Sequence, residues 1–269
     1  MPSFIELEQS KLNYTIKGHG TKTLLAFHGF SQSAKDYDKM SKAVQNEYTV
    51  YSFDLFFHGE SIWEQKEKAL EKEELARFIA AFLEKENIDY FSIVGYSLGG
   101  KFLLSILESF SKQIKEIIFI APDGIKTNFW YSLATYPIIL RRFFKSMMLN
   151  PAPMFRLMGF LKKLGIVEKG LYKFATSQLI TESQRKRVYY SWTVFRHLDF
   201  NMKNIASIIN ENHIEVQMYL GKYDKIITEK NMNNLLHLLD HYNLKMLDVG
   251  HNTLLDDVAN YIGSQSNAQ

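Results

Sequence analysis

The 269 residues include 32 lysines and arginines, 29 acidic residues and no cysteine, and 46% of them are hydrophobic. This composition fits one large folded α/β domain, alone or with an insertion. The lack of cysteine excludes a disulfide framework, a thiolate nucleophile and a cysteine-ligated zinc, and it favours a reducing compartment. We find neither a signal-peptide pattern after Met1 nor a stretch suited to a membrane span, so we predict a cytoplasmic location.

Apolar runs alternate with helical patterns through the first 122 residues. Two short alternating runs, 4–7 and 12–16, predict an antiparallel hairpin at a sheet edge. Strands and helices then follow in turn, with strands expected at 23–27, 48–54, 90–94 and 116–120 and helices at 33–44, 68–86 and 98–110. This alternation predicts a doubly wound, mostly parallel sheet, which carries its chemistry at the carboxyl ends of its strands.

The alternation stops between residues 123 and 205. This segment has 14 lysines and arginines against 4 acidic residues, a net charge of +10, whereas the remainder has a net charge of −7. It contains no convincing buried strand, and helices are expected at 136–148, 153–164, 171–176 and 182–195. We predict that it is a helical cap inserted over the catalytic edge of the sheet, between core segments 1–122 and 206–269.

The strand and helix pattern returns after the insertion. Strands are expected at 214–220 and 244–247, and helices at 228–241 and 252–262. Together with the earlier runs they predict a sheet of about eight strands.

The stretch from Gly95 to Gly99 connects a predicted strand to a predicted helix almost without a loop. So tight a reversal requires strained dihedrals at Ser97 and small residues two positions before and after it. It would present the Ser97 hydroxyl at the carboxyl end of the sheet, beside a helix N-terminus that favours negative charge. Taken alone, the pentapeptide could equally be a glycine-rich turn capped by serine.

A serine hydroxyl becomes a good nucleophile only with a base, and the base needs a carboxylate to orient it. Asp224 follows a late strand, and His251 lies between the last strand and the last helix, so both can reach the carboxyl edge of the sheet. Asp123 also follows a strand; it is either a rival acid or a cap of the insertion's first helix. The backbone N–H groups of Leu98 and Phe30 are expected to stabilise a developing oxyanion.

Five pieces of the sequence, in this order, resemble the α/β-hydrolase family over nearly the whole chain: 28–30, 54–61, 95–99, 221–224 and 250–251. The resemblance implies a triad of Ser97, His251 and Asp224, an oxyanion hole formed by the amides of Phe30 and Leu98, and a cap over the pocket. It implies no metal and no organic cofactor. In the second piece the family usually reads Asp-x-x-Gly-His-Gly-x-Ser.

Phe57 replaces the first glycine of that second piece, so a different turn is expected there. Asp54 and His58, from the same piece, are expected to have structural roles.

The resemblance implies a serine hydrolase that cleaves a small-molecule carboxylic ester or thioester through an acyl-enzyme on Ser97. A second hypothesis is an elimination lyase, because 28–31 and 95–101 are similar to the menaquinone-pathway synthase that eliminates pyruvate from a succinyl cyclohexadiene carboxylate. That synthase typically has arginine where this chain has Lys101. A third hypothesis is a binding protein that keeps the pocket without turnover.

The predicted cap is rich in aromatic residues and methionine, which would line an apolar pocket or pack its helices together. Residues 136–148 combine basic and apolar side chains and resemble an interfacial helix, so weak contact with a lipid surface is one interpretation and packing on the sheet is the other. No nucleic-acid-binding motif accompanies the basic residues, and we expect no nucleic-acid partner.

Overall fold

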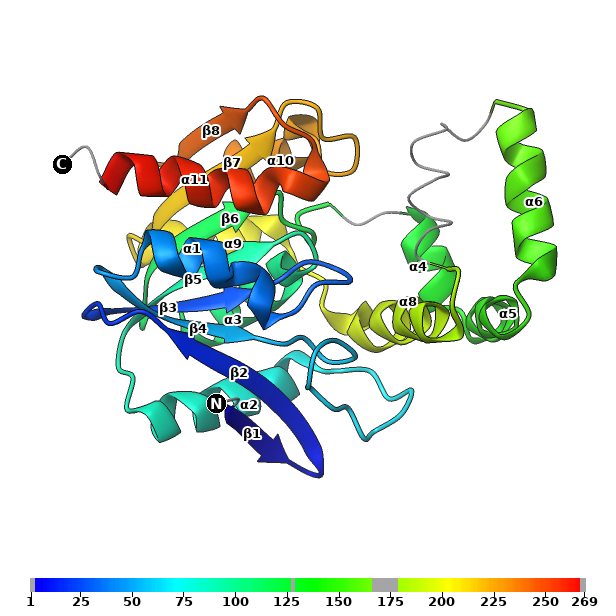
Figure 1. The fold of residues 1–269 in the computed structure, drawn as a ribbon, viewed down its shortest axis with the longest axis horizontal. Helices are drawn as coiled ribbons and strands as arrows, with labels where there is room; N and C mark the ends of the chain where they lie inside the picture. The colour runs from blue at the N-terminus through cyan, green and yellow to red at the C-terminus, as the bar shows by residue number, and fades with distance from the viewer. Residues whose placement is uncertain (1–2, 127–128, 166–178, 267–269) are drawn as a thin grey trace. The chain divides into compact units, whose positions relative to one another are not determined.

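The computed structural model describes residues 3–126, 129–165 and 179–266 (Figure 1). The chain divides into two compact units. The first, the sheet unit, comprises Met1–Lys66, Glu71–Thr127 and Leu198–Gln269, and the second, the helical unit, comprises Glu67–Leu70 and Asn128–His197. The helical unit lies within the predicted insertion 123–205 apart from residues 67–70, and its role as a cap stays a prediction. The helix expected at 171–176 lies outside the described residues.

The sheet unit contains an eight-stranded sheet with the order β1-β2-β4-β3-β5-β6-β7-β8. Its strands are β1 (Ser3–Leu7), β2 (Ser10–Lys17), β3 (Lys22–Phe27), β4 (Tyr48–Phe53), β5 (Phe91–Tyr96), β6 (Ile114–Ile120), β7 (Glu215–Gly221) and β8 (Asn243–Leu247). The first hairpin pairs antiparallel with itself and with β4, and all other neighbours are parallel. The predicted fold class, a mostly parallel sheet with a hairpin at its edge, is therefore confirmed.

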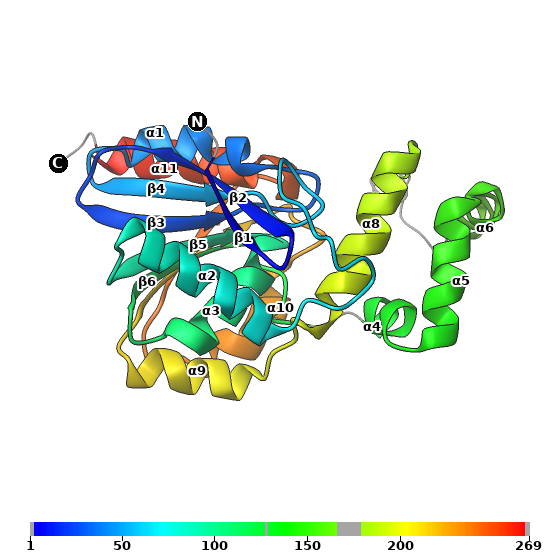
Figure 2. The same cartoon turned by 90° about the horizontal axis from the view of Figure 1, so that it is seen from below.

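Helices cover both faces of this sheet (Figure 2). One face carries α1 (Asp38–Ala43) and α11 (Leu254–Ser266), and the other carries α2 (Lys72–Glu86), α3 (Gly99–Phe110), α9 (Met202–Glu211) and α10 (Glu229–Leu236). The apolar spacing explains the orientation of α2, because the buried Leu75, Phe78, Ile79 and Phe82 fall on one side of the helix.

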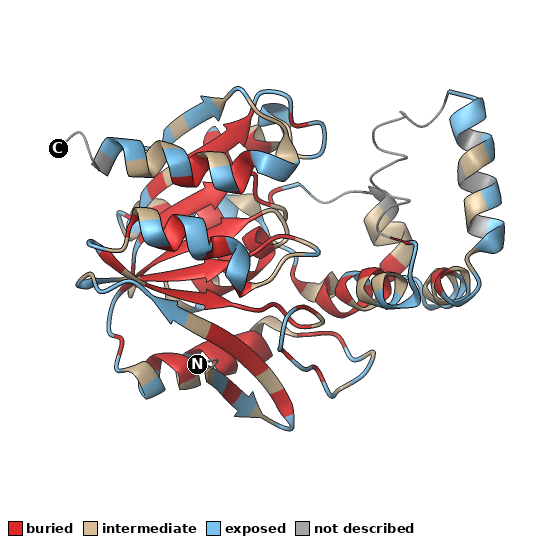
Figure 3. Cartoon of the chain, in the orientation of Figure 1, coloured by how far each residue is buried: buried red, intermediate tan, exposed pale blue. Residues whose placement is uncertain are grey.

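The core lies around the central strands, which are buried on both faces, as expected for parallel strands covered by helices (Figure 3). Aromatic side chains fill one part of it: the Phe27 and Phe53 rings stack 4.9 Å apart, and the Phe82 ring meets Phe53 edge-on at 4.8 Å. Each fully buried phenylalanine stabilises the fold by roughly 2 kcal/mol through burial alone. This packing holds β3, the strand that leads toward Phe30, against its neighbour β4.

Several element boundaries differ from those expected. The helix expected at 33–44 is a 3₁₀ turn, Ala34–Tyr37, followed by the short α1. The α2 helix begins four residues later than expected because residues 67–70 belong to the helical unit. The α10 helix ends at Leu236 instead of residue 241. The α9 helix was not predicted; the side chain of Asn201 caps it by accepting hydrogen bonds from the amides of Lys203 and Asn204.

The helical unit contains α4 (Phe129–Thr135), α5 (Ile138–Leu149), α6 (Ala152–Lys163) and α8 (Glu182–Val194). The Arg185 side chain fastens α8 to the end of α5 by donating to the Met148 carbonyl oxygen at 2.8 Å. Residues 67–70 join this unit through two kinds of contact: the Leu70 amide donates to the Val194 carbonyl oxygen, and the Glu67 carboxylate pairs with Lys145. Within the described residues, no helix is long and apolar enough to cross a bilayer.

Candidate active site

Ser97 lies between the end of β5 and the start of α3, with its backbone in the left-handed region at φ 48°. This conformation costs a non-glycine residue about 1 kcal/mol. The strand end beside it holds it there: the Ser97 amide donates to the Ile120 carbonyl oxygen at 3.0 Å, and the Ser97 carbonyl oxygen accepts from the Asp123 amide at 2.8 Å. The strained turn that the sequence predicted is thus fixed from the neighbouring strand.

Gly99 allows the start of α3 to approach the end of β3. A methyl group in place of its hydrogen would lie 1.9 Å from the Phe27 carbonyl oxygen and 2.9 Å from that of His28. No rotation of a side chain could relieve such an overlap, because both partners are backbone atoms. Glycine at this position therefore sets the distance between the Ser97 turn and the segment that contains Phe30.

Three side chains form a chain of hydrogen bonds at the carboxyl edge of the sheet. His251 Nε2 lies 3.0 Å from Ser97 Oγ, and His251 Nδ1 lies 2.6 Å from Asp224 Oδ2. Because an ionised carboxylate only accepts hydrogen bonds, we assign the proton to His251 Nδ1, which leaves Nε2 as the acceptor for the serine hydroxyl. The structure thus brings together the three residues that the sequence singled out.

Asp224 is held rigidly in this arrangement. Its side chain has no exposed surface. Its second oxygen, Oδ1, accepts hydrogen bonds from the amides of Ile226 at 2.8 Å and Ile227 at 2.9 Å. Amide donors to a buried carboxylate stabilise its charged form and fix its direction. The carboxylate can therefore orient the imidazole and stabilise a positive charge on it.

The loops that carry Asp224 and His251 are joined by their backbones. They follow the neighbouring strands β7 and β8, and the Tyr223 amide donates to the Val249 carbonyl oxygen at 3.0 Å. A methyl group on Gly221 would lie 2.6 Å from that same carbonyl oxygen. The close approach that glycine permits thus brings the acid and the histidine within hydrogen-bond distance, although 27 residues separate them.

Tyr96, directly before the serine, also contacts the histidine loop. Its hydroxyl donates to the His251 carbonyl oxygen at 2.6 Å, and the two rings lie 5.3 Å apart. Burial, reinforced by the negative charges of Asp224 and Asp36, raises the pKa of Tyr96 well above the usual value for a phenol. The hydroxyl therefore stays protonated and remains a donor. Sequence reasoning missed this contact, since its acceptor is a backbone atom that leaves no signature in the sequence.

Phe30 and Leu98 follow the ends of β3 and β5, at the same edge of the sheet as Ser97. Within the described part of the chain, neither of their backbone amides has a hydrogen-bond partner. The turn before Phe30 is supported by His28, whose Nε2 accepts from the Leu55 amide at 3.0 Å and whose Nδ1 therefore donates to the Gly29 carbonyl oxygen at 2.7 Å. Both amides are available to a ligand.

Asp123 takes neither of the roles considered for it. Its carboxylate accepts a hydrogen bond from the Gly124 amide at 2.8 Å, and the histidine contact belongs to Asp224. It also caps no helix, because α4 begins only at Phe129. The capping interpretation was therefore wrong.

Asp54 organises the turn that departs from the family pattern. One of its oxygens accepts from the Ala34 amide at 2.7 Å, and the other accepts from the Glu60 amide and the Asn13 side chain. Phe57 has a φ of 68°, a left-handed backbone that glycine would adopt more easily. These contacts match the structural role expected for Asp54.

A separate cavity of about 750 Å³ opens at the opposite, amino-terminal edge of the strands. Lys22, Tyr48 and Glu116 are among its lining residues, and none of the three hydrogen-bonded residues Ser97, Asp224 and His251 lines it. It is therefore distinct from the candidate active site. In the described residues, no cluster of three or more histidine, aspartate or glutamate side chains is arranged to hold a metal ion.

Comparisons with known proteins point to one fold. A family model described as the alpha/beta hydrolase fold matches residues 22–145. An esterase of known structure from Thermogutta terrifontis superimposes with a TM-score of 0.70 at 12% identity, covering 99% of this chain and 97% of that one. At this identity the likeness concerns the fold alone.

Two curated relatives each match less than half of the chain. The dihydrolipoyllysine-residue acetyltransferase component of the acetoin cleaving system of Cupriavidus necator is 26% identical over 121 residues, which are 45% of this chain and 32% of that protein. The pyrrolizixenacetamide deacetylase of Xenorhabdus hominickii is 25% identical over 114 residues, 42% of each protein. The matched part thus spans less than half the length of either relative.

Proposed function

Because this chain belongs to the α/β-hydrolase fold family, we propose that it is a serine hydrolase that cleaves a carboxylic ester or a thioester. The observation that carries the proposal is the pair of hydrogen bonds that links Ser97 Oγ to His251 Nε2 and His251 Nδ1 to Asp224 Oδ2. Acyl transfer through serine requires a nucleophile in contact with a base, and a base in contact with an orienting acid.

In the first half of the reaction, Ser97 Oγ attacks the carbonyl carbon of the substrate while its proton moves to His251 Nε2. The carbonyl oxygen becomes negatively charged, and the free amides of Phe30 and Leu98 supply two hydrogen bonds to it. His251 then gives the proton to the leaving alcohol or thiol, the bond to the leaving group breaks, and the acyl group remains on Ser97.

In the second half, water replaces the leaving group. His251 Nε2 removes a proton from water as the oxygen attacks the acyl carbon, and it returns the proton to Ser97 Oγ as the acid is released. Asp224 stabilises the imidazolium in both halves, through its hydrogen bond to Nδ1. The steps need only these side chains, two backbone amides and water.

The choice of an acyl substrate has a second line of support. The name of the deacetylase relative describes removal of an acyl group, and the acetyltransferase relative is named for acyl transfer. An ester or thioester with a small or medium acyl chain is therefore the substrate class that we propose.

Intact-mass spectrometry after treatment with a fluorophosphonate tests the proposal directly. We expect one adduct on the wild-type protein and none on Ser97→Ala, because the reagent reacts with an activated serine hydroxyl. Ser146→Ala, which removes an exposed hydroxyl from α5, is the matched control and should retain the adduct.

Untreated wild-type protein and the untreated Ser97→Ala variant are then assayed with a panel of acyl esters and thioesters. Ser97→Ala should lower kcat/KM by roughly 10⁴-fold or more without changing the fold. An adduct on Ser97→Ala, or undiminished turnover by it, would contradict the assignment of the nucleophile. A folded wild type that forms no adduct would instead favour the lyase or the ligand-binding hypothesis.

A further inference from the structure

The helices α5 and α6 expose an unusual number of large apolar side chains. They include Ile138, Ile139, Phe143, Leu149 and Phe160, and Leu164 follows directly after α6. The least exposed of these, Ile138, keeps 53% of its surface in contact with solvent, and the most exposed, Ile139, keeps 75%. Figure 3 shows both helices mostly as exposed or intermediate, in contrast to the buried strands. Exposed apolar clusters of this kind mark interaction surfaces.

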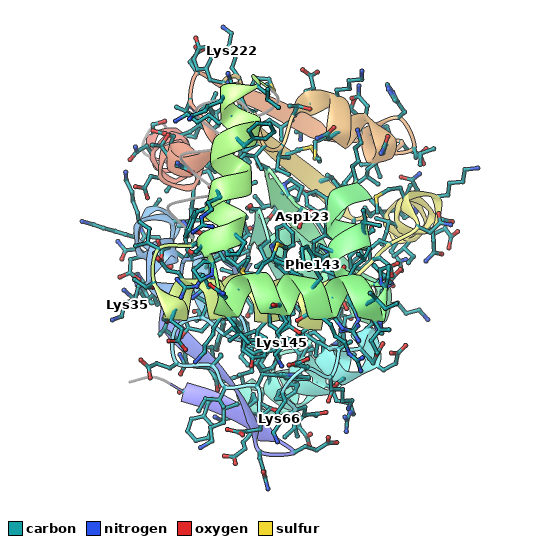
Figure 4. All side chains as sticks on the ribbon, turned by 90° about the vertical axis from the view of Figure 1, so that its right-hand side faces the viewer. Lys35, Lys66, Asp123, Phe143, Lys145 and Lys222 are labelled. Carbon is teal, nitrogen blue, oxygen red and sulfur yellow. The ribbon has the colours of Figure 1, made fainter. Side chains whose placement is uncertain are left out.

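The exposed residues of α5 belong to a well-packed helix. Its buried side carries Phe144, whose ring lies 5.6 Å from both Tyr189 and Trp192 of α8. Phe143 and Lys145 lie on different sides of α5 in Figure 4, as expected for positions about 200° apart around a helix. Lys145 pairs with Glu67 on one side of α5, and Phe143 lies on a different side of the helix from this ion pair. The apolar residues are therefore fixed in place by the packing behind them.

Positive charge accompanies this apolar surface. Residues 136–165 contain six lysines and arginines and no acidic residue. Among the described residues, Arg142, Arg156 and Lys163 have no acidic partner, and all three are exposed. A helix that combines unpaired cations with exposed isoleucine, leucine and phenylalanine can lie flat on a membrane. Its apolar groups enter the headgroup boundary, and its cations meet anionic lipids.

We infer that the α5–α6 surface, defined by Ile139, Phe143, Phe160, Arg142 and Lys163, binds the surface of an anionic lipid bilayer. Each helix has 12 residues and is about 18 Å long, too short to span the hydrocarbon core, so it lies on the membrane. A nucleic acid would pair with the cations but would give the aliphatic side chains no apolar partner. This inference does not depend on the proposed serine chemistry.

Vesicle flotation with the full chain tests the inference. The probes are vesicles of phosphatidylcholine alone and of phosphatidylcholine mixed with phosphatidylglycerol. We expect binding to the mixed vesicles, weaker binding at high salt, and little binding to phosphatidylcholine. Phe143→Ser should lower the partition coefficient roughly tenfold, since it removes an aromatic side chain that would enter the headgroup boundary. Arg142→Gln should lower it about fivefold, the share of one cation near an anionic surface.

Matched substitutions in the sheet unit serve as controls. Phe4→Ser removes another exposed phenylalanine, and Lys35→Gln removes another exposed cation, labelled in Figure 4; both should bind vesicles like the wild type. Equal binding to neutral and anionic vesicles, or equal loss with all four variants, would overturn the inference. Two other results for Phe143→Ser would also overturn it, if vesicle binding stayed unchanged. Dissociation of a dimer would mean that the surface faces a second copy of the chain. A changed KM for soluble esters would mean that it faces the substrate.

Discussion

The sheet unit and the helical unit differ in how much room they leave around the backbone. In the sheet unit, a methyl group on Gly99 would overlap the Phe27 carbonyl oxygen at 1.9 Å, and one on Gly221 would lie 2.6 Å from the Val249 carbonyl oxygen. In the helical unit, a methyl group on Gly159 of α6 would meet no atom within 4 Å. The units also differ in charge, with a net −7 on the sheet unit and +10 on the helical unit.

This difference separates two requirements on the sequence. Reaction chemistry through Ser97 and His251 needs distances fixed to within a few tenths of an ångström, and backbone contacts between strand ends provide them. Recognition of a surface needs only the right kinds of side chain, so α5 and α6 can tolerate substitution where the strand ends cannot.

The largest expected effect follows from removing the base. His251→Ala should lower the turnover of esters by roughly 10⁴-fold, because it removes the imidazole that contacts Ser97 Oγ and would take its proton. The thermal midpoint should change little, since His251 lies at the edge of the sheet. Steady-state kinetics and a thermal melt measure both quantities.

The matched control for the base is His237→Ala, an exposed histidine of the same unit just after α10, which should keep full activity. A His251→Ala protein that retained activity would show that the geometry of the strand ends is not the source of the chemistry. The sheet unit would then not differ from the helical unit in the need for fixed distances.

Glycine substitutions compare the two units directly. Gly99→Ala should destabilise the fold by about 3 kcal/mol or more, because α3 or β3 must move to make room for the methyl group. Gly159→Ala should be neutral or stabilising by up to about 1 kcal/mol, since alanine favours a helix interior and the space around it is empty. Denaturant unfolding of both variants measures the difference; similar costs at the two sites would mean that the two units do not differ in the room around their glycines.

A smaller effect is expected where the sheet unit positions the histidine. Tyr96→Phe removes the hydrogen bond to the His251 carbonyl oxygen but keeps the ring that packs beside the imidazole. We expect kcat to fall about tenfold with KM unchanged, the cost of one lost hydrogen bond felt mainly in the transition state. Tyr37→Phe, which removes a buried hydroxyl that donates to the Phe27 carbonyl oxygen, is the control for a general loss of packing. Equal loss with both variants would deny Tyr96 a specific positioning role.

The sequence predicted the fold well, because its signals are local. Apolar runs marked each strand, and polar residues in the loops after the strand ends marked the site, so Ser97, Asp224 and His251 could be expected to meet before any coordinates. Their roles in catalysis stay predictions. The element boundaries were less certain, since the ends of α1 and α10 depend on 3₁₀ turns and tertiary contacts.

Contacts between distant segments could not be predicted. Glu67 belongs to the helical unit through Lys145, 78 residues away, and nothing in the local pattern indicates that pairing. Phe57, which stands where the family usually has glycine, has a left-handed backbone with a φ of 68°. The contacts of Asp54 with three neighbouring segments hold the turn that contains it, and they are not visible in the sequence either.

The smallest expected effect compares one carboxylate from each unit as the pH falls. In the sheet unit, burial and the charge of Glu215 raise the pKa of Glu116, despite hydrogen bonds from Tyr48 and Gln217. In the helical unit, burial alone would raise the pKa of Glu67, but hydrogen bonds and charge from Lys145, with a hydrogen bond from Tyr189, outweigh it and lower the pKa.

These opposite shifts imply opposite changes in stability. A raised carboxyl pKa means that the folded state binds its proton more tightly than the unfolded chain, so acidification from neutral pH through the carboxylate range adds stability through Glu116. A lowered pKa means the reverse: Glu67 stabilises the fold above the usual carboxylate pKa, and its contribution is lost as the pH falls through its folded pKa. Glu116→Gln should therefore raise the thermal midpoint slightly near neutral pH, and Glu67→Gln should lower it. Both differences in thermal midpoint from the wild type should shrink in melts at about pH 4. If Glu116→Gln were less stable than the wild type at neutral pH, the hydrogen bonds to the Glu116 carboxylate would outweigh the cost of its burial.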